Sequence, residues 1–78
     1  MSLNEAEVGK YYIITAINGK GPLKRRVMDM GLTKGTQIFI RKVAPLGDPV
    51  QINLRNYELS LRKSDAELIE VQEITEVN

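Results

Sequence analysis

Residues 50–61 constrain the fold of this chain more than any other stretch, because apolar and polar side chains alternate on both sides of a short turn. A slip of one residue would set Ile52 against a polar partner, so the pattern predicts a single register. If Arg55 and Asn56 form the turn, the apolar pairs are Leu54 with Tyr57, Ile52 with Leu59 and Val50 with Leu61, and the polar pairs on the other face are Asn53 with Glu58 and Gln51 with Ser60. A lone hairpin is marginal in water, so the rest of the chain must cover its apolar face, Tyr57 included.

The length and the missing residue types limit the class of protein. The 78 residues make one domain, in which residues 74–78 are expected to form a frayed tail. Neither cysteine nor histidine occurs, so the chain offers no disulfide, no thiolate metal site and no imidazole base. No nucleophile is paired with a base, and no enzyme is expected. The acidic start of the chain and the lack of a long apolar run indicate a soluble, cytoplasmic protein.

Three further strands are expected around the hairpin. Residues 11–17 are almost all β-branched or aromatic, and turn residues flank them. Residues 37–43 alternate until Lys42-Val43, where the break predicts a bulge. Residues 69–73 form the last strand, and the elements together predict a mainly β, partly open barrel of about five strands.

The N-terminal segment and Phe39 raise one question about the outer side of this barrel. Leu3 and Val8 are expected to tuck onto the core. Phe39 falls on the outer side of its strand, so either the N-terminal segment covers it or it belongs to an exposed binding patch.

One short α-helix is predicted after the first strand. Pro22 suits its first turn, and Leu23, Val27 and Met30 recur on one side as a stripe that must dock on the sheet. Gly31 fits the left-handed residue that ends a helix. One helical turn is expected before the last strand, because Ser64 and Glu67 have the spacing of a capping box.

Two features of the sequence are candidates for recognition. The loop Ala44-Pro45-Leu46-Gly47-Asp48-Pro49 should be stiff and exposed, since its prolines fix φ and restrict the residues before them. The charges are also uneven: residues 20–42 hold seven bases against one carboxylate, whereas the chain from Asp65 onward holds five carboxylates and no base. This polarity predicts either a steering surface for a charged partner or two solvated faces.

Several of these segments together resemble a known family. They are Leu32-Thr33-Lys34-Gly35, the loop at residues 44–49, Leu59-Ser60-Leu61-Arg62 followed by Asp65-Ala66, and Ile69-Glu70-Val71. In this order they resemble the FeoA family, the small cytoplasmic accessory proteins of bacterial ferrous iron transport, over residues 3–71. The resemblance implies an SH3-like barrel that acts with the membrane transporter FeoB, whose cytoplasmic part contains a GTPase domain. It also implies binding of transition-metal ions.

The expected function is therefore that of a non-enzymatic regulatory partner that binds the cytoplasmic part of a FeoB-type transporter and is recruited to the inner face of the membrane. The basic side chains would steer and pair with carboxylates, and the loop would supply shape. The residues expected to contact the partner are Lys24, Arg25, Arg26, Pro45, Leu46, Gly47, Asp48 and Pro49.

Two alternative functions stay open at this point. The first is a small β-barrel nucleic-acid-binding module with a basic strip, which the near-neutral net charge of +1 and the few aromatic residues disfavour. The second is direct transition-metal binding. No cofactor or metal residue is assigned, because Asp29 and Asp48 are isolated in sequence and Met28 and Met30 are expected in the core.

Overall fold

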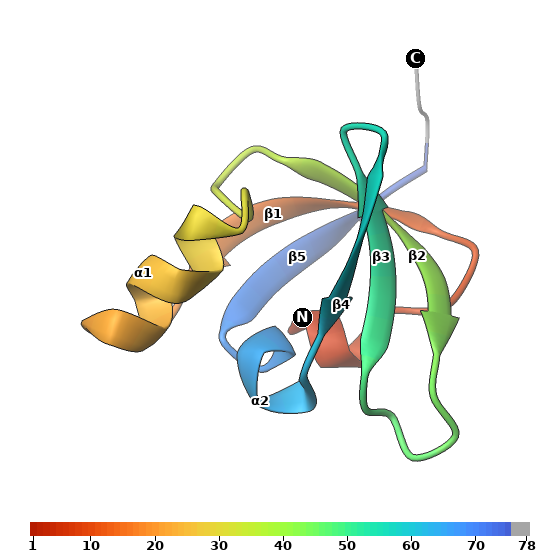
Figure 1. Ribbon diagram of the computed structural model, residues 1–78. Helices are drawn as coiled ribbons and strands as arrows, with labels where there is room; N and C mark the ends of the chain where they lie inside the picture. The colour runs from red at the N-terminus through yellow and green to blue at the C-terminus, as the bar shows by residue number, and fades with distance from the viewer. Residues whose placement is uncertain (76–78) are drawn as a thin grey trace.

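The computed structural model of the protein describes residues 1–75 and leaves residues 76–78 outside the description. A single antiparallel sheet in the order β4-β3-β2-β1-β5 curls into a partly open barrel, so β4 and β5 are its edges (Figure 1). The strands are β1 (Tyr11–Ile17), β2 (Gln37–Val43), β3 (Val50–Leu54), β4 (Tyr57–Leu61) and β5 (Ile69–Ile74). The helices are the 3-10 turn η1 (Leu3–Glu5), α1 (Pro22–Asp29) and α2 (Lys63–Ala66). The predicted fold class and element order are confirmed.

The β3–β4 hairpin has the predicted register. All five cross-strand pairs, from Val50 with Leu61 to Leu54 with Tyr57, occur as the alternation requires. Arg55 and Asn56 form the turn with φ angles of 48° and 69°, as a tight two-residue turn needs. The polarity of alternate side chains therefore sets the pairing of this half of the sheet.

The core lies inside the curl of the sheet and is lined by alternate residues of every strand. Leu3 of η1 closes one side, and the buried Tyr12 hydroxyl accepts a hydrogen bond from the Glu7 backbone N–H at 2.9 Å. The prediction that Val8 also packs on the core is wrong. Val8 is 54% exposed because the chain reverses direction at Val8 and Gly9.

Two bulges bend the sheet. The predicted one lies between Ile40 and Lys42, where the register of β2 against β3 shifts. The other, between Ile14 and Ala16, interrupts the pairing of β1 with β5 and has no signal in the alternation of β1. Ile74, predicted to be frayed, is the last residue of β5 and pairs with Tyr11.

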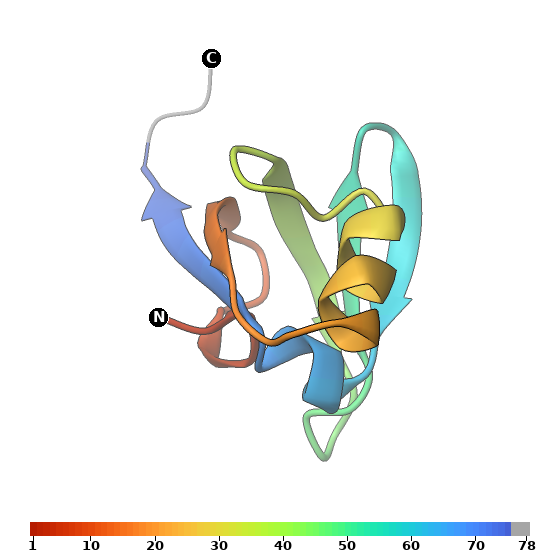
Figure 2. The same cartoon turned by 90° about the vertical axis from the view of Figure 1, so that its left-hand side faces the viewer.

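Helix α1 is docked at one end only. Val27 is fully buried, and Gly31 follows the helix with a φ of 93°, as predicted for its end. Leu23 is 49% exposed, so the prediction that the whole apolar stripe docks is wrong. The first turn of α1, which contains Leu23, projects beyond the sheet (Figures 1 and 2).

Tyr57 links the hairpin to the end of α1. Its side chain is on the core side of β4 but 44% exposed, so the expectation that it is covered is only partly met. The Tyr57 hydroxyl donates a hydrogen bond of 2.6 Å to the Met30 carbonyl. A Cβ added at Gly31 would lie 3.0 Å from the Tyr57 hydroxyl oxygen. The hairpin therefore satisfies a carbonyl that the helix end leaves free.

Replacing Tyr57 by Phe removes this hydrogen bond and keeps the ring. We expect the free energy of unfolding to fall by about 1 kcal/mol, the usual net value of one hydrogen bond. Urea denaturation measures it. Tyr11→Phe is the matched control, because no hydrogen bond from the Tyr11 hydroxyl to the rest of residues 1–75 is present. Equal effects of the two substitutions would contradict the proposed link.

Candidate interaction surface

The helical turn α2 lies between the two segments predicted to contact a partner. Both views of the ribbon place it below α1 and beside the loop at residues 44–49 (Figures 1 and 2). Each segment is joined to α2 by one carboxylate contact, described next.

The first contact joins α1 to α2. The Arg26 guanidinium donates a hydrogen bond to Oδ1 of Asp65, and the two groups also form an ion pair. The Asp65 side chain is only 8% exposed, whereas that of Arg26 is 56% exposed. Because an ionised carboxylate is costly to bury without a partner, the Arg26 guanidinium stabilises the fold by pairing with Asp65.

The second contact joins the loop to α2. Oδ1 of Asp48 accepts a hydrogen bond of 3.1 Å from the backbone N–H of Lys63, the first residue of the helical turn. The predicted Ser64–Glu67 capping box is wrong: the turn begins one residue earlier, and its N-cap Arg62 makes no side-chain cap. A carboxylate from a distant loop replaces the local cap, as suits a helix N-terminus with free N–H groups.

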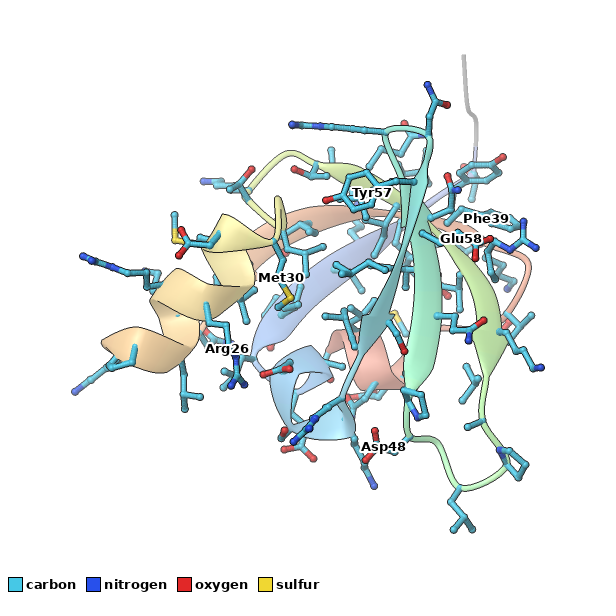
Figure 3. All side chains as sticks on the ribbon, in the orientation of Figure 1. Arg26, Met30, Phe39, Asp48, Tyr57 and Glu58 are labelled. Atoms are coloured by element: carbon cyan, nitrogen blue, oxygen red, sulfur yellow. The ribbon has the colours of Figure 1, made fainter. Side chains whose placement is uncertain are left out.

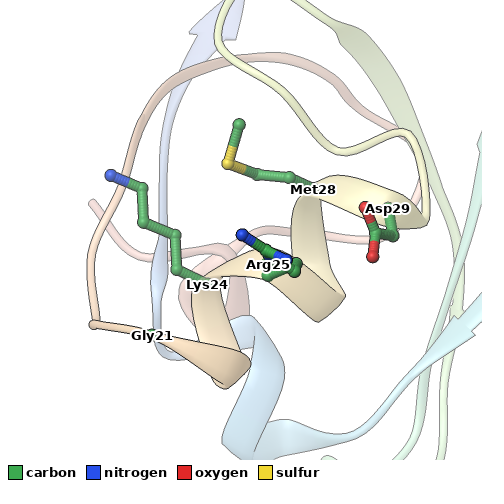
Figure 4. Close-up of a pocket in the computed structure, with 5 residues that line it drawn as sticks. All are labelled: Gly21, Lys24, Arg25, Met28 and Asp29. Carbon is green, nitrogen blue, oxygen red and sulfur yellow. The ribbon is translucent and has the colours of Figure 1, made fainter.

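The outer side of α1 remains open to solvent. A shallow hollow of about 450 Å³ lies against it, lined by Gly21, Lys24, Arg25, Met28 and Asp29 (Figure 4). Lys24 and Met28 reach out from successive turns in the same direction. Met28 is 42% exposed, so its expected place in the core is wrong, whereas Met30 packs partly against the core. The surface thus carries two basic side chains, one carboxylate and the exposed thioether of Met28.

The loop at residues 44–49 is compact and presents one apolar side chain. Backbone hydrogen bonds close it, from Gly47 N–H to the Ala44 carbonyl at 2.7 Å and from Ala44 N–H to the Pro49 carbonyl at 3.1 Å. Leu46 stands at its tip, 90% exposed, and a hollow of about 500 Å³ beside the loop is lined by Asp48, Pro49, Ser60 and Arg62. The loop is thus exposed and locally braced, as its prolines suggest.

The uneven charges are partly neutralised within the protein. Besides Asp65, Glu70 pairs with the N-terminal ammonium and Glu73 with Lys10, both at 3.5 Å. A hydrogen bond from Lys10 lowers the pKa of Glu7 and raises the pKa of Lys10. In contrast, Lys24 and Arg25 form no ion pair with any group of residues 1–75. Two unpaired positive charges are thus adjacent on α1, and the other bases of residues 20–42 that are unpaired within the described part of the chain, Lys20, Lys34 and Lys42, lie outside it.

The described residues form no evident metal site. No three Asp or Glu side chains within residues 1–75 gather closely enough to hold an ion. The sulfur atoms of Met28 and Met30 belong to an exposed and a partly buried side chain, respectively. Within the same residues, no helix has the length and apolarity needed to cross a membrane.

Sequence reasoning missed two aspects of this surface. It assigned Leu23 and Met28 to the core, since helical periodicity cannot show how far a sheet extends beneath a helix. It also missed Asp65, which is 39 residues from Arg26 and has no local signal. In the sequence, Asp65 is one of five carboxylates from residue 65 onward, and nothing local marks it as buried.

These features define a small, mainly β SH3-like domain in which α1 and the loop at residues 44–49 present exposed side chains. A FeoA-like protein from Clostridium acetobutylicum has the same fold, with a TM-score of 0.89 and 41% identity over 100% of this chain and 91% of that chain. FeoA of Stenotrophomonas maltophilia, described as a prokaryotic SH3 domain protein complexed with zinc, has a TM-score of 0.80 at 21% identity over 92% of this chain and 89% of that chain. That second likeness shows the fold alone.

The family follows from the sequence comparison. The FeoA domain model matches residues 1–73. An Fe(2+) transport protein A/Fe(2+) transporter FeoB fusion protein of Porphyromonas gingivalis is 37% identical over 75 residues, which is 96% of this chain but 9% of that protein. The chain belongs to the FeoA family of ferrous iron transport.

The Arg26–Asp65 contact predicts a difference between two neighbouring arginines. Arg26→Met leaves Asp65 buried without its partner, and we expect the free energy of unfolding to fall by about 1–2 kcal/mol. The loss is smaller than for a fully buried ion pair because solvent screens the half-exposed Arg26 side chain. Arg25→Met, the control, should change it little. Urea denaturation of both variants checks this, and equal stabilities would contradict the contact.

The Asp48 cap predicts a difference between two substitutions at one position. Asp48→Ala removes the acceptor for the Lys63 N–H and should cost about 1 kcal/mol, whereas Asp48→Asn keeps an equally good capping oxygen and should cost much less. Thermal unfolding ranks the three proteins. A ranking in which Asn is as harmful as Ala would show that the negative charge, not the cap, matters.

Proposed function

We propose that the protein is a non-enzymatic accessory factor of ferrous iron uptake that binds the cytoplasmic part of a FeoB-type transporter. The fusion relative is the observation that carries this proposal, since it joins a FeoA-like segment and FeoB in a single chain. A covalent fusion holds its two parts at a high effective concentration, which favours a contact between them. A separate FeoA domain must reach the same partner by affinity, on the cytoplasmic side of the membrane.

The open face of α1 and the loop at residues 44–49 are the proposed contact surface. Lys24 and Arg25 supply unpaired positive charge around Met28, and Leu46 supplies an apolar side chain that is 90% exposed. Interfaces gain affinity from such apolar anchors and association rate from charge at their rim. Arg26 and Asp48 would act in this surface by holding α1 and the loop on α2.

The donor groups of the chain do not fit a transition-metal site. Ferrous iron is the cargo of the transport system, and binding it tightly favours imidazole or thiolate ligands, neither of which this sequence contains. Carboxylate oxygens prefer hard cations, and they do not gather in threes within residues 1–75. The proposed role therefore rests on protein contacts alone.

Charge reversal on α1 tests the contact surface. Lys24→Glu with Arg25→Glu should weaken binding to the purified cytoplasmic region of a FeoB-type transporter by about tenfold or more, with most of the loss at low salt. Titration calorimetry measures the dissociation constant. Arg26 is left intact, so that the variant keeps its contact with Asp65.

The matched control is Lys34→Glu with Arg55→Glu, which changes the net charge equally at exposed positions outside both α1 and the loop. It should bind nearly as well as the unaltered protein. Equal weakening by both variants would mean that net charge rather than this face acts. Absence of binding by the unaltered protein would remove the proposed partner.

A further inference from the structure

The two edges of the sheet are not equally protected. Along β5, the start of the chain covers the outer side: Ser2 forms a β-bridge with Glu70. The Val71 N–H also donates a hydrogen bond of 2.8 Å to the Met1 carbonyl. Along β4, no other backbone segment of residues 1–75 pairs with the outer side. Figure 2 shows β4, in cyan, at the margin of the molecule with no further element beyond it. Such an edge is a template on which another strand can form hydrogen bonds.

The register of the hairpin identifies the backbone groups that the β4 edge leaves free. Leu54 and Tyr57 flank the two-residue turn, so they exchange the first pair of ladder hydrogen bonds, and such pairs alternate from there. The N–H and C=O groups of Glu58 and Ser60 therefore point away from β3. Within residues 1–75 these groups have no hydrogen-bond partner. Two donors and two acceptors thus lie in one row, with the spacing that a strand requires.

The devices that commonly block an edge are missing from β4. Its five residues contain no proline and no lysine, and its pairing with β3 has no bulge. Glu58 is the one charged residue of the strand, and its carboxylate is paired with Arg41 at 3.0 Å. Figure 3 shows the Glu58 and Tyr57 side chains on opposite sides of β4. Neither side chain closes the edge between them.

Side chains beside this edge are also left without full cover. Tyr57 is 44% exposed and Leu59 is half-buried, although both are on the core side of β4. Arg62 follows the strand with an extended backbone, at φ −71° and ψ 150°, and lines the hollow beside the loop at residues 44–49. Its guanidinium forms no ion pair within residues 1–75. An added strand would therefore meet apolar side chains on one face and an unpaired positive charge at one end of the other.

We propose that the β4 edge binds an extended segment of another protein as a further antiparallel strand. The segment has apolar side chains at alternate positions, facing Tyr57 and Leu59, and an acidic residue opposite Arg62. The free backbone groups of Glu58 and Ser60 supply affinity for any extended chain, and the side chains supply the choice between segments. The proposal does not rest on the transporter as partner, because it uses neither the open face of α1 nor Leu46.

Other occupants match this edge less well. A helix satisfies its own N–H and C=O groups, and nucleic-acid phosphates offer no donors for the free carbonyls. A second copy paired through its own β4 would be related by a two-fold axis, which puts both copies of α1 on the same side of the joined sheet. Each α1 is held beside β4 by the hydrogen bond of 2.6 Å from Tyr57 to Met30, so the two helices would compete for one space.

The outer face of the sheet also has apolar side chains, but they select no particular ligand. Phe39 is half-buried and contacts the Tyr11 ring, with centroids 4.7 Å apart, so it is neither fully covered nor freely exposed. Ile13 and Ile74 on the neighbouring strands are half-buried as well. No row of free backbone groups accompanies them, because each central strand is paired on both sides.

The test is a titration of the full isotope-labelled protein with the capped peptide Glu-Val-Thr-Val-Lys-Val, whose glutamate would lie opposite Arg62 and whose lysine would lie opposite Glu58. With peptide at about ten times its dissociation constant, hydrogen exchange of the Glu58 and Ser60 amides should slow about tenfold, because they become hydrogen-bonded. The Leu59 amide, already bonded to β3, should change less.

Two substitutions at Ser60 separate strand pairing from side-chain contact. Ser60→Pro removes the outward N–H, which an edge strand tolerates, and should weaken peptide binding about tenfold or more. Ser60→Ala keeps the N–H and should weaken it less than about twofold. Equal binding by the two variants would overturn the proposal.

A second pair of measurements does not depend on a proline in the strand. A peptide with lysine in place of the glutamate should bind about two- to fivefold more weakly, as expected for one exposed ion pair. Arg62→Glu should reverse this preference, and Lys34→Glu should leave it unchanged; the Arg62 side chain is exposed and makes no cap, so the variant keeps the fold.

Three outcomes would contradict strand addition at β4. They are no shift at millimolar peptide, shifts centred on β5 or the outer face, and protection of the Glu58 and Ser60 amides by self-association without peptide. Loss of transporter binding by the α1 variants leaves all of these measurements unaffected, so failure of the proposed function and failure of this inference are distinguishable.

Discussion

The burial of the Asp65 carboxylate beneath the Arg26 guanidinium governs how the helical part of this protein sits on its sheet. Helix α1 has one fully buried residue, Val27, which is too little apolar surface to fix the direction of an eight-residue helix. The ion pair at its middle and the Tyr57 hydroxyl at its end supply the remaining constraints. Each is a polar contact with a different strand or turn, so the position of α1 depends on the barrel being already formed.

The same turn, α2, also receives the Asp48 side chain from the loop at residues 44–49. Two segments that are about 20 residues apart in sequence are thereby held on one support at the open side of the barrel, between its edge strands. This leaves the outer residues of both segments, Lys24, Arg25, Met28 and Leu46, available to a partner.

The strands were predictable because alternation is a local pattern. The hairpin at residues 50–61 could be paired residue by residue, and the break at Lys42-Val43 located a bulge. What the sequence could not show depends on where distant elements end. Helical periodicity placed Leu23 and Met28 inside because it cannot reveal that the sheet stops short of them. The capping box at Ser64 was displaced by a carboxylate from residue 48, a contact with no local signature. The basic residues of α1 were found by composition, but only the structure separated Arg26, which is paired, from Lys24 and Arg25.

If α1 and the loop form one partner surface on α2, a transporter must contact both segments at once. Chemical-shift mapping of the isotope-labelled protein with the unlabelled cytoplasmic region of a FeoB-type transporter reports on both segments in one titration. We expect shifts at Lys24, Arg25 and Met28 together with Leu46 and Gly47, saturating at the same transporter concentration. Shifts in only one of the two segments, or shifts confined to the outer face of the sheet, would contradict it.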